Sequence, residues 1–145
     1  MATEAMTVTA MAPTPADPDA ARFLQGLALL NAGEAFDAHE VWEELWLEAG
    51  GARARFLQGM IQLAVAMHHW QAGRHPAARR LLERGEAKLR TPDTPGLSGL
   101  WSSSEALAWS ATLFAPLLTE KDTGKEPEAP PPSEWPHCGP DAVQL

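Results

Sequence analysis

The chain repeats one sextet, RFLQGL at residues 22–27 and RFLQGM at residues 55–60, and this repeat decides the fold. After each copy an apolar helical pattern runs to an Ala-Gly pair, at residues 32–33 and again at residues 72–73, and a second helical pattern begins. Glycine commonly follows the last turn of a helix, because it adopts the left-handed backbone conformation at little cost. The repeat therefore predicts two αα-hairpins that pack side by side.

Glycine and proline mark where the helices begin and end. We expect helices at about residues 18–32, 35–48, 52–72 and 76–90, the first of them capped by Asp17. Gly26 and Gly59 both lie in helix interiors, where glycine costs about 1 kcal/mol relative to alanine. Close approach of a neighbouring helix at each glycine is the expected compensation.

A fifth helix is predicted after the second hairpin. Ser102 and Glu105 have the spacing of a capping box, in which each side chain accepts a hydrogen bond from the backbone of the other. Apolar residues then recur at helical spacing up to Leu118, and Pro116 is expected to bend or end the helix. The predicted fold class is all-α: a small helical bundle of two packed αα-hairpins plus a C-terminal helix.

The two ends of the chain differ in composition from this helical domain, which we place at residues 17–118. Residues 1–16 are rich in Ala, Thr and Pro, residues 119–145 are rich in Pro, Glu and Gly, and both segments are predicted to be disordered. Neither a signal peptide nor a run of about 18 apolar residues is visible, so no membrane partner is expected. The single cysteine, Cys138, leaves no disulfide framework, and a cytoplasmic location is the expectation.

Charge is unevenly distributed along the chain. The net charge is −8, yet residues 22–90 carry nine bases and eight acids, which argues against a nucleic-acid partner. Residues 34–48 carry six acids and no base, and residues 74–90 carry six bases and two acids. We expect these two helices to be neighbours joined by surface ion pairs; the alternative is a basic partner surface on residues 74–90.

The helix at residues 35–48 places ionisable groups among aromatic side chains. At about 100° per residue, His39, Glu43 and Trp46 lie within about 60° of one another, with Phe36 and Trp42 at the margins. Ionisable groups in such surroundings need partners. They are therefore either a hydrogen-bonded network or a binding site.

The helix at residues 52–72 is apolar nearly all round and carries one narrow polar stripe. By helical geometry Gln58, Gln62 and His69 lie within about 40° of one another. We expect this stripe to face His39 and Glu43 and to form a polar pocket with them. Four residues are predicted to bind a small polar ligand there, the two tryptophans as apolar walls: Trp42, Trp46, Gln58 and Gln62.

Three hypotheses for this pocket stay open. In the first, His39, Glu43 and His69 are ligands of a divalent metal ion such as Zn²⁺, Mn²⁺ or Ni²⁺. In the second, the order His39-Glu40-x-x-Glu43 is an altered form of the H-E-x-x-H metalloprotease helix, and Glu40 is the general base of a metal-dependent hydrolase. In the third, the polar groups only satisfy one another, and the domain is a structural or interaction scaffold.

Residues 23–90 resemble the bacterial and plant family known as domain of unknown function 309. The resemblance rests on Asn31-Ala-Gly33, FDAHEVWE at residues 36–43 with Trp46, RFLQGMIQLA at residues 55–64, and His69 followed by Gly73. It implies a small all-helical fold, and it implies no reaction. The family signature singles out seven positions: His39, Glu40, Glu43, Trp46, Gln58, Gln62 and His69. Where the family usually has an aromatic residue before the histidine, this chain has His68.

Overall fold

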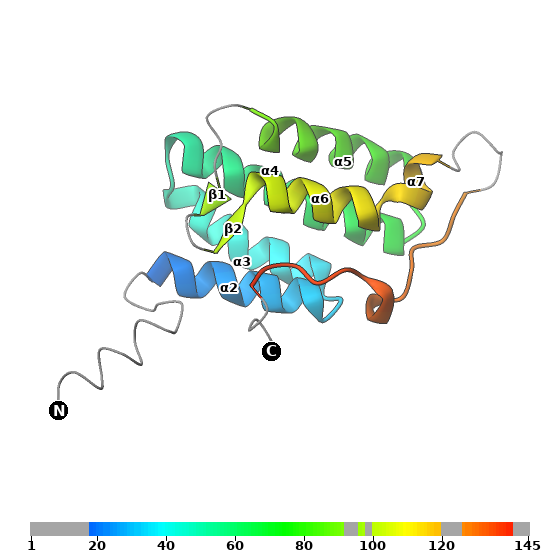
Figure 1. Cartoon of the computed structure of the whole chain (residues 1–145), viewed down its shortest axis with the longest axis horizontal. Helices are drawn as coiled ribbons and strands as arrows, with labels where there is room; N and C mark the ends of the chain where they lie inside the picture. Colours follow the sequence, from blue (N-terminus) through cyan, green and yellow to red (C-terminus); the bar gives the residue numbers. More distant parts are fainter. Residues whose placement is uncertain (1–17, 92–95, 98–99, 120–125, 141–145) are drawn as a thin grey trace.

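The computed structural model describes residues 18–91, 96–97, 100–119 and 126–140 (Figure 1). The predicted leader, the Asp17 cap and parts of the predicted tail lie outside these residues. The elements in chain order are α2 (Pro18–Asn31), α3 (Ala35–Glu48), α4 (Gly51–Gln71), α5 (His75–Leu89), β1 (Gly96–Leu97), β2 (Trp101–Ser102), α6 (Ser103–Leu113) and α7 (Ala115–Thr119). The all-α prediction is confirmed, and helix boundaries fall within a few residues of those expected.

The helices form two hairpins, α2–α3 and α4–α5, and α4 is the central element. It packs against both α3 and α5, and α6 lies over α4 and α5. Both hairpins have the same corner after their first helix. Gly33 has φ 88° and Gly73 has φ 81°, and the next backbone N–H of each, Glu34 or Arg74, donates back to a carbonyl in the last helical turn.

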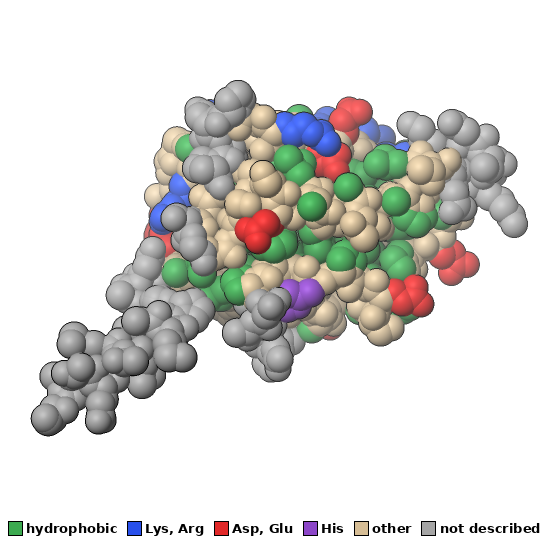
Figure 2. All heavy atoms as spheres, viewed as in Figure 1, with side chains coloured by type: hydrophobic (Ala, Val, Ile, Leu, Met, Phe, Trp, Pro, Cys, Tyr) green, Lys and Arg blue, Asp and Glu red, His purple; other side chains and the backbone are tan. Residues whose placement is uncertain are grey.

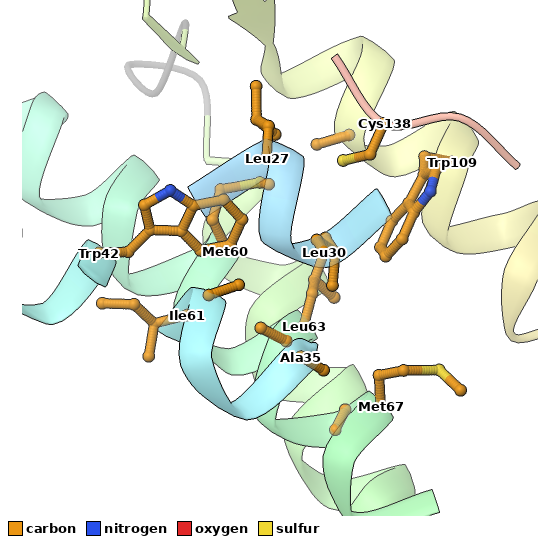
Figure 3. Packing of buried hydrophobic residues seen from close by; sticks show 14 of the residues in the cluster. Leu27, Leu30, Ala35, Trp42, Met60, Ile61, Leu63, Met67, Trp109 and Cys138 are labelled. Atoms are coloured by element: carbon orange, nitrogen blue, oxygen red, sulfur yellow. The ribbon is translucent and has the colours of Figure 1, made fainter. Parts of the chain in front are cut away.

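The core of the first hairpin is built around Trp42, which is completely buried (Figure 3). Its ring stacks on Phe23 with centroids 5.5 Å apart, and its indole Nε1 donates to the carbonyl oxygen of Phe23 at 3.2 Å. Gly26 leaves the space that this indole fills, since a Cβ on Gly26 would lie 2.0 Å from Trp42 Nε1. The mid-helix glycine of the first sextet is thus matched to one aromatic side chain.

The second hairpin uses its glycines differently. A Cβ on Gly85 of α5 would lie 3.0 Å from the carbonyl oxygen of Gly59, and a Cβ on Gly59 would lie 3.2 Å from that of Gly85. Neither helix therefore tolerates a side chain at this point without a shift. The close approach expected at Gly59 is confirmed, with another glycine as its partner.

The predicted capping box is present at the start of α6. The backbone N–H of Glu105 donates to Ser102 Oγ at 3.0 Å, and the Ser102 N–H donates to Glu105 Oε1 at 2.9 Å. Helix α6 ends before Phe114 and α7 begins after it, so Pro116 lies in the first turn of a new helix. The short β1–β2 pair before α6 was not predicted, because two residues per strand are too few to show alternation.

Residues 126–140, which we call the C-terminal strap, run along α2 and α6 (Figure 1). Three indole N–H groups, those of Trp70, Trp109 and Trp135, each donate to a proline carbonyl of the strap at 2.9 Å. Cys138 is buried beside Leu27 and Trp109 (Figure 3), and burial raises the pKa of its thiol. The expected disorder is therefore wrong for these residues, because an extended proline-rich segment exposes carbonyls that buried indoles can satisfy.

Within the described ranges, no helix combines the length and the apolar character that crossing a membrane requires.

Candidate functional site

The first turn of α3 fixes the orientation of His39. The ring Nδ1 lies 2.5 Å from the carbonyl oxygen of Phe36. A carbonyl oxygen can only accept a hydrogen bond, so Nδ1 carries the hydrogen and donates it. In the neutral ring the lone pair is therefore on Nε2. That nitrogen lies 3.8 Å from Glu43 Oε1, one helical turn further on. The separation is too long for a direct hydrogen bond, so in the neutral ring Nε2 and the carboxylate are two acceptors that face each other.

An aromatic ring joins His39 to α4. The Phe36 ring, which is 46 % exposed, lies edge-on to the His39 ring with centroids 4.7 Å apart. The same ring also lies 4.9 Å from the ring of His68, between centroids. We call these four residues, Phe36, His39, Glu43 and His68, the α3 face. The α3 face combines a half-exposed apolar surface with two imidazoles and one carboxylate. The carboxylate belongs to Glu43, whose side chain is 52 % exposed.

His68 occupies the place that we expected His69 to take. His69 lies next to the α4–α5 corner, where its Nδ1 accepts a hydrogen bond from Arg74 Nε at 2.8 Å. Desolvation and the Arg74 guanidinium lower the pKa of both His68 and His69. His39 lowers the pKa of His68 further, and His68 and Arg80 lower the pKa of His69 further. Both rings therefore favour their neutral form.

The predicted polar stripe of α4 exists, but it faces α5 and not α3. Gln62 Oε1 accepts from Lys88 Nζ of α5 at 3.0 Å, and Gln58 lines a groove between α4 and α5. The expectation that this stripe faces His39 and Glu43 is wrong. Because α4 packs between two helices, its polar stripe could face either of them, and residue spacing alone does not show which. The α4 histidine that faces α3 is His68, which precedes His69 and lies about 100° around the helix from it.

The tryptophans expected to form ligand walls belong to the core. Trp42 is fully buried, and Trp46 packs against the core while partly exposed. A ligand at the surface cannot reach Trp42 without unfolding α3 locally. The half-exposed aromatic ring of the α3 face is that of Phe36, which the helical pattern had already placed at the margin of this stripe.

The metal and hydrolase hypotheses meet a geometric limit. Among the described residues, no three His, Cys, Asp or Glu side chains are placed to hold one metal ion, so His39, Glu43 and His69 do not form the expected triad. Glu40 is exposed, and no hydrogen bond or ion pair between described residues involves it. The α3 face offers two acceptor atoms, His39 Nε2 and Glu43 Oε1, beside an aromatic ring.

The match to known families covers the residues that build this face. Residues 23–81 match the family model described as Domain of unknown function (DUF309). We call these residues, which are less than half of the chain, the DUF309 segment. The segment includes most of α2, all of α3 and α4 and the first half of α5, and hence every residue of the α3 face. No curated protein and no solved structure matches the chain.

Proposed function

We propose that the DUF309 segment binds a small polar ligand on the α3 face, with a positively charged or hydrogen-bond-donating group of the ligand between His39 and Glu43. The observation that carries this proposal is the 3.8 Å separation of His39 Nε2 and Glu43 Oε1. The hydrogen bond from Nδ1 to the Phe36 carbonyl leaves Nε2 as an acceptor in the neutral ring. A donor placed between these two atoms would satisfy both at once.

The surroundings favour a ligand with an apolar part beside its donor. The exposed part of the Phe36 ring supplies an apolar and cation-attracting surface within reach of both acceptors. The lowered pKa of His68 keeps a second neutral imidazole on the other side of that ring. A compact alkylammonium group fits this combination of acceptors and aromatic surface.

A divalent metal ion is the second candidate, and the helical spacing favours it. His39 and Glu43 are one turn apart on α3, an arrangement that lets an imidazole nitrogen and a carboxylate oxygen reach one ion. Two protein ligands leave the remaining positions to water or to a bound substrate. The DUF309 segment is in this case an ion-binding module, and Glu40 takes no part.

The test uses two glutamates of the same helix as a matched pair. The full chain is titrated with ethylammonium chloride and, separately, with Zn²⁺, Mn²⁺ and Ni²⁺, while binding is followed by calorimetry and by the melting temperature. Glu43→Gln and His39→Ala should abolish the response that the wild type gives, whereas Glu40→Gln should retain it. Saturation at about 100 times the dissociation constant should stabilise the fold by about 2.7 kcal/mol.

Which probe binds decides between the two candidates, and two results would refute both. An ethylammonium response alone assigns an organic ligand, and a metal response alone assigns the ion-binding module. Equal loss of binding in Glu40→Gln and Glu43→Gln would mean that probes are attracted only by the general negative charge of α3. A wild type that responds to no probe would remove the α3 face as a site.

A further inference from the structure

The groove between α4 and α5 has a lining that contains cations and no described acidic side chain. Its volume is about 510 Å³, within the range of roughly 300–1,000 Å³ that is usual for small-molecule sites. From α4 come Arg55 and Gln58, and from α5 come Arg84 and Lys88. Figure 2 shows Lys and Arg side chains, with Asp or Glu side chains among them, along the upper edge of the molecule, where α5 runs in Figure 1.

The packing of the second hairpin explains why this groove is open. The two helices touch at Gly59 and Gly85, where no side chain separates their backbones. Beyond this contact, toward the start of α4 and the end of α5, the groove is lined by the small residues Ala54 and Ala87 between the long cationic side chains. Space therefore remains at the level where the charges converge.

Arg84 and Lys88 differ from Arg79 and Arg90 in their partners. Arg79 is paired with Glu126 at 2.7 Å, and Arg90 is paired with Glu86 at 3.6 Å. Lys88 is instead held by a neutral group, since its Nζ donates to Gln62 Oε1. Within the part of the chain that the structure describes, Arg84 has no acidic partner. The expected ion pairs between α3 and α5 are likewise absent from the described residues, because both helices pack on α4, and Arg79 and Arg90 pair with Glu126 and Glu86.

We infer that the α4–α5 groove binds a small molecule that carries a phosphate group. A guanidinium presents a planar fork of donors that matches phosphate oxygens, and an ammonium adds a compact charge. Arg84 supplies the fork, Lys88 the ammonium, and the Gln58 amide a neutral donor in the same lining. A nucleic acid fits less well, because the basic cluster is confined to one groove on a chain of net charge −8.

The experiment titrates the full chain with inorganic phosphate and with pyrophosphate and follows heat release. Wild-type protein should bind pyrophosphate saturably, with a dissociation constant of about 1 mM or tighter. Arg84→Gln and Lys88→Gln should each weaken binding by tenfold or more. Arg80→Gln is the matched control: it removes the same charge from an exposed position of α5 outside the groove, and it should change the constant less than twofold. Arg84→Lys, which keeps the charge and loses the fork, should fall between.

Four outcomes would overturn the assignment. One is the absence of saturable binding by both probes, and another is a loss in Arg80→Gln equal to that in Arg84→Gln, which would indicate general charge attraction. A third is an unchanged affinity in Arg84→Gln and Lys88→Gln when circular dichroism shows both variants folded. The fourth is tighter binding of a single-stranded oligonucleotide than of pyrophosphate, with Arg80 contributing as much as Arg84, which would indicate a nucleic-acid surface.

Discussion

The two hairpins start from the same sextet and turn at the same kind of corner, but their glycines accommodate different neighbours. Gly26 lies under the indole of Trp42, whereas Gly59 lies against the backbone of Gly85 and the side chain of Leu89. One glycine makes room for a large side chain, and the other lets two helices touch. A repeated motif therefore specifies where space is left and does not specify what fills it.

This difference separates the two candidate sites. In the first hairpin the indole fills the space inside, and the outer surface of α3 carries Phe36, His39 and Glu43. In the second hairpin the helix backbones approach closely at Gly59 and Gly85, and the groove beside that approach carries Arg84 and Lys88. Acceptors thus gather on one hairpin, and cationic donors gather on the other.

The α2–α3 and α4–α5 corners also differ in what packs against them. Asn31 at the end of α2 exchanges two hydrogen bonds with the Cys138 backbone of the strap, at 2.8 and 2.7 Å. Gln71, the equivalent residue of α4, is exposed. Gly33 lies against the ring of Pro132, since a Cβ there would be 2.5 Å from it, and no atom lies within 4 Å of such a position on Gly73. The strap therefore fills the space beside Gly33 and not the space beside Gly73, and it meets the second corner at His75, whose Nε2 lies 2.6 Å from the Pro127 carbonyl oxygen.

The largest expected effect comes from filling the space at Gly26. Gly26→Ala should reduce the free energy of unfolding by about 3 kcal/mol, because a buried indole with a hydrogen bond to Phe23 must move. Gly59→Ala should cost about 1 kcal/mol, because the Leu89 side chain can shift and alanine improves helix propensity. Denaturant unfolding of both variants measures the difference. Equal losses would mean that the glycines are equivalent and that the comparison of the hairpins fails.

An intermediate effect is expected at the first corner. Asn31→Ala should cost about 2 kcal/mol, because it removes both hydrogen bonds and leaves the N–H of buried Cys138 without a partner. The equivalent change Gln71→Ala should stay within about 0.5 kcal/mol, as is usual at exposed positions. The two midpoints in urea provide the test. A stability unchanged by Asn31→Ala would show that the strap does not hold the first hairpin.

The smallest effect is a pH dependence that belongs to the second hairpin. His68 and His69 align with Ala28 and Leu29 of the first, so the imidazoles at these positions belong to the second hairpin alone. The pKa of each imidazole is lowered in the folded chain, so the unfolded chain binds protons first as the pH falls below about 6.5. Their contribution to stability is therefore present above that pH and is lost on acidification.

Replacing one imidazole should reduce this loss. His68→Gln should lose less stability than the wild type between pH 7.5 and pH 5, measured as the shift of the urea midpoint. The same shift in both proteins would contradict the lowered pKa of His68.

The repeat and the breakers were sufficient to predict the hairpins, the capping box and the mid-helix contacts, because these depend on local spacing. The sequence also grouped Gln58, Gln62 and His69 correctly on one stripe, yet the partner helix was wrong. Spacing determines which side chains share a face, whereas packing determines what that face meets. For the same reason spacing did not place His68, which lies against Phe36.

The strap could not be predicted by composition. Its proline and glutamate content is typical of a segment that buries too little apolar surface to fold alone. Its order depends on donors supplied by distant residues, the indoles of Trp70 and Trp109 and the amide of Asn31. No local signal in the sequence connected these tryptophans with proline carbonyls.

The division of the two hairpins into an acceptor face and a cationic groove is tested most directly by two-dimensional NMR of the uniformly ¹⁵N-labelled full chain. Separate samples are titrated with Zn²⁺, with ethylammonium and with pyrophosphate. At least one of the two cations should shift the amides of residues 36–43 and of His68, and pyrophosphate should shift those of residues 51–58 and 84–91. Shifts of the same amides by cation and anion, or no saturable shift from any probe, would contradict the division.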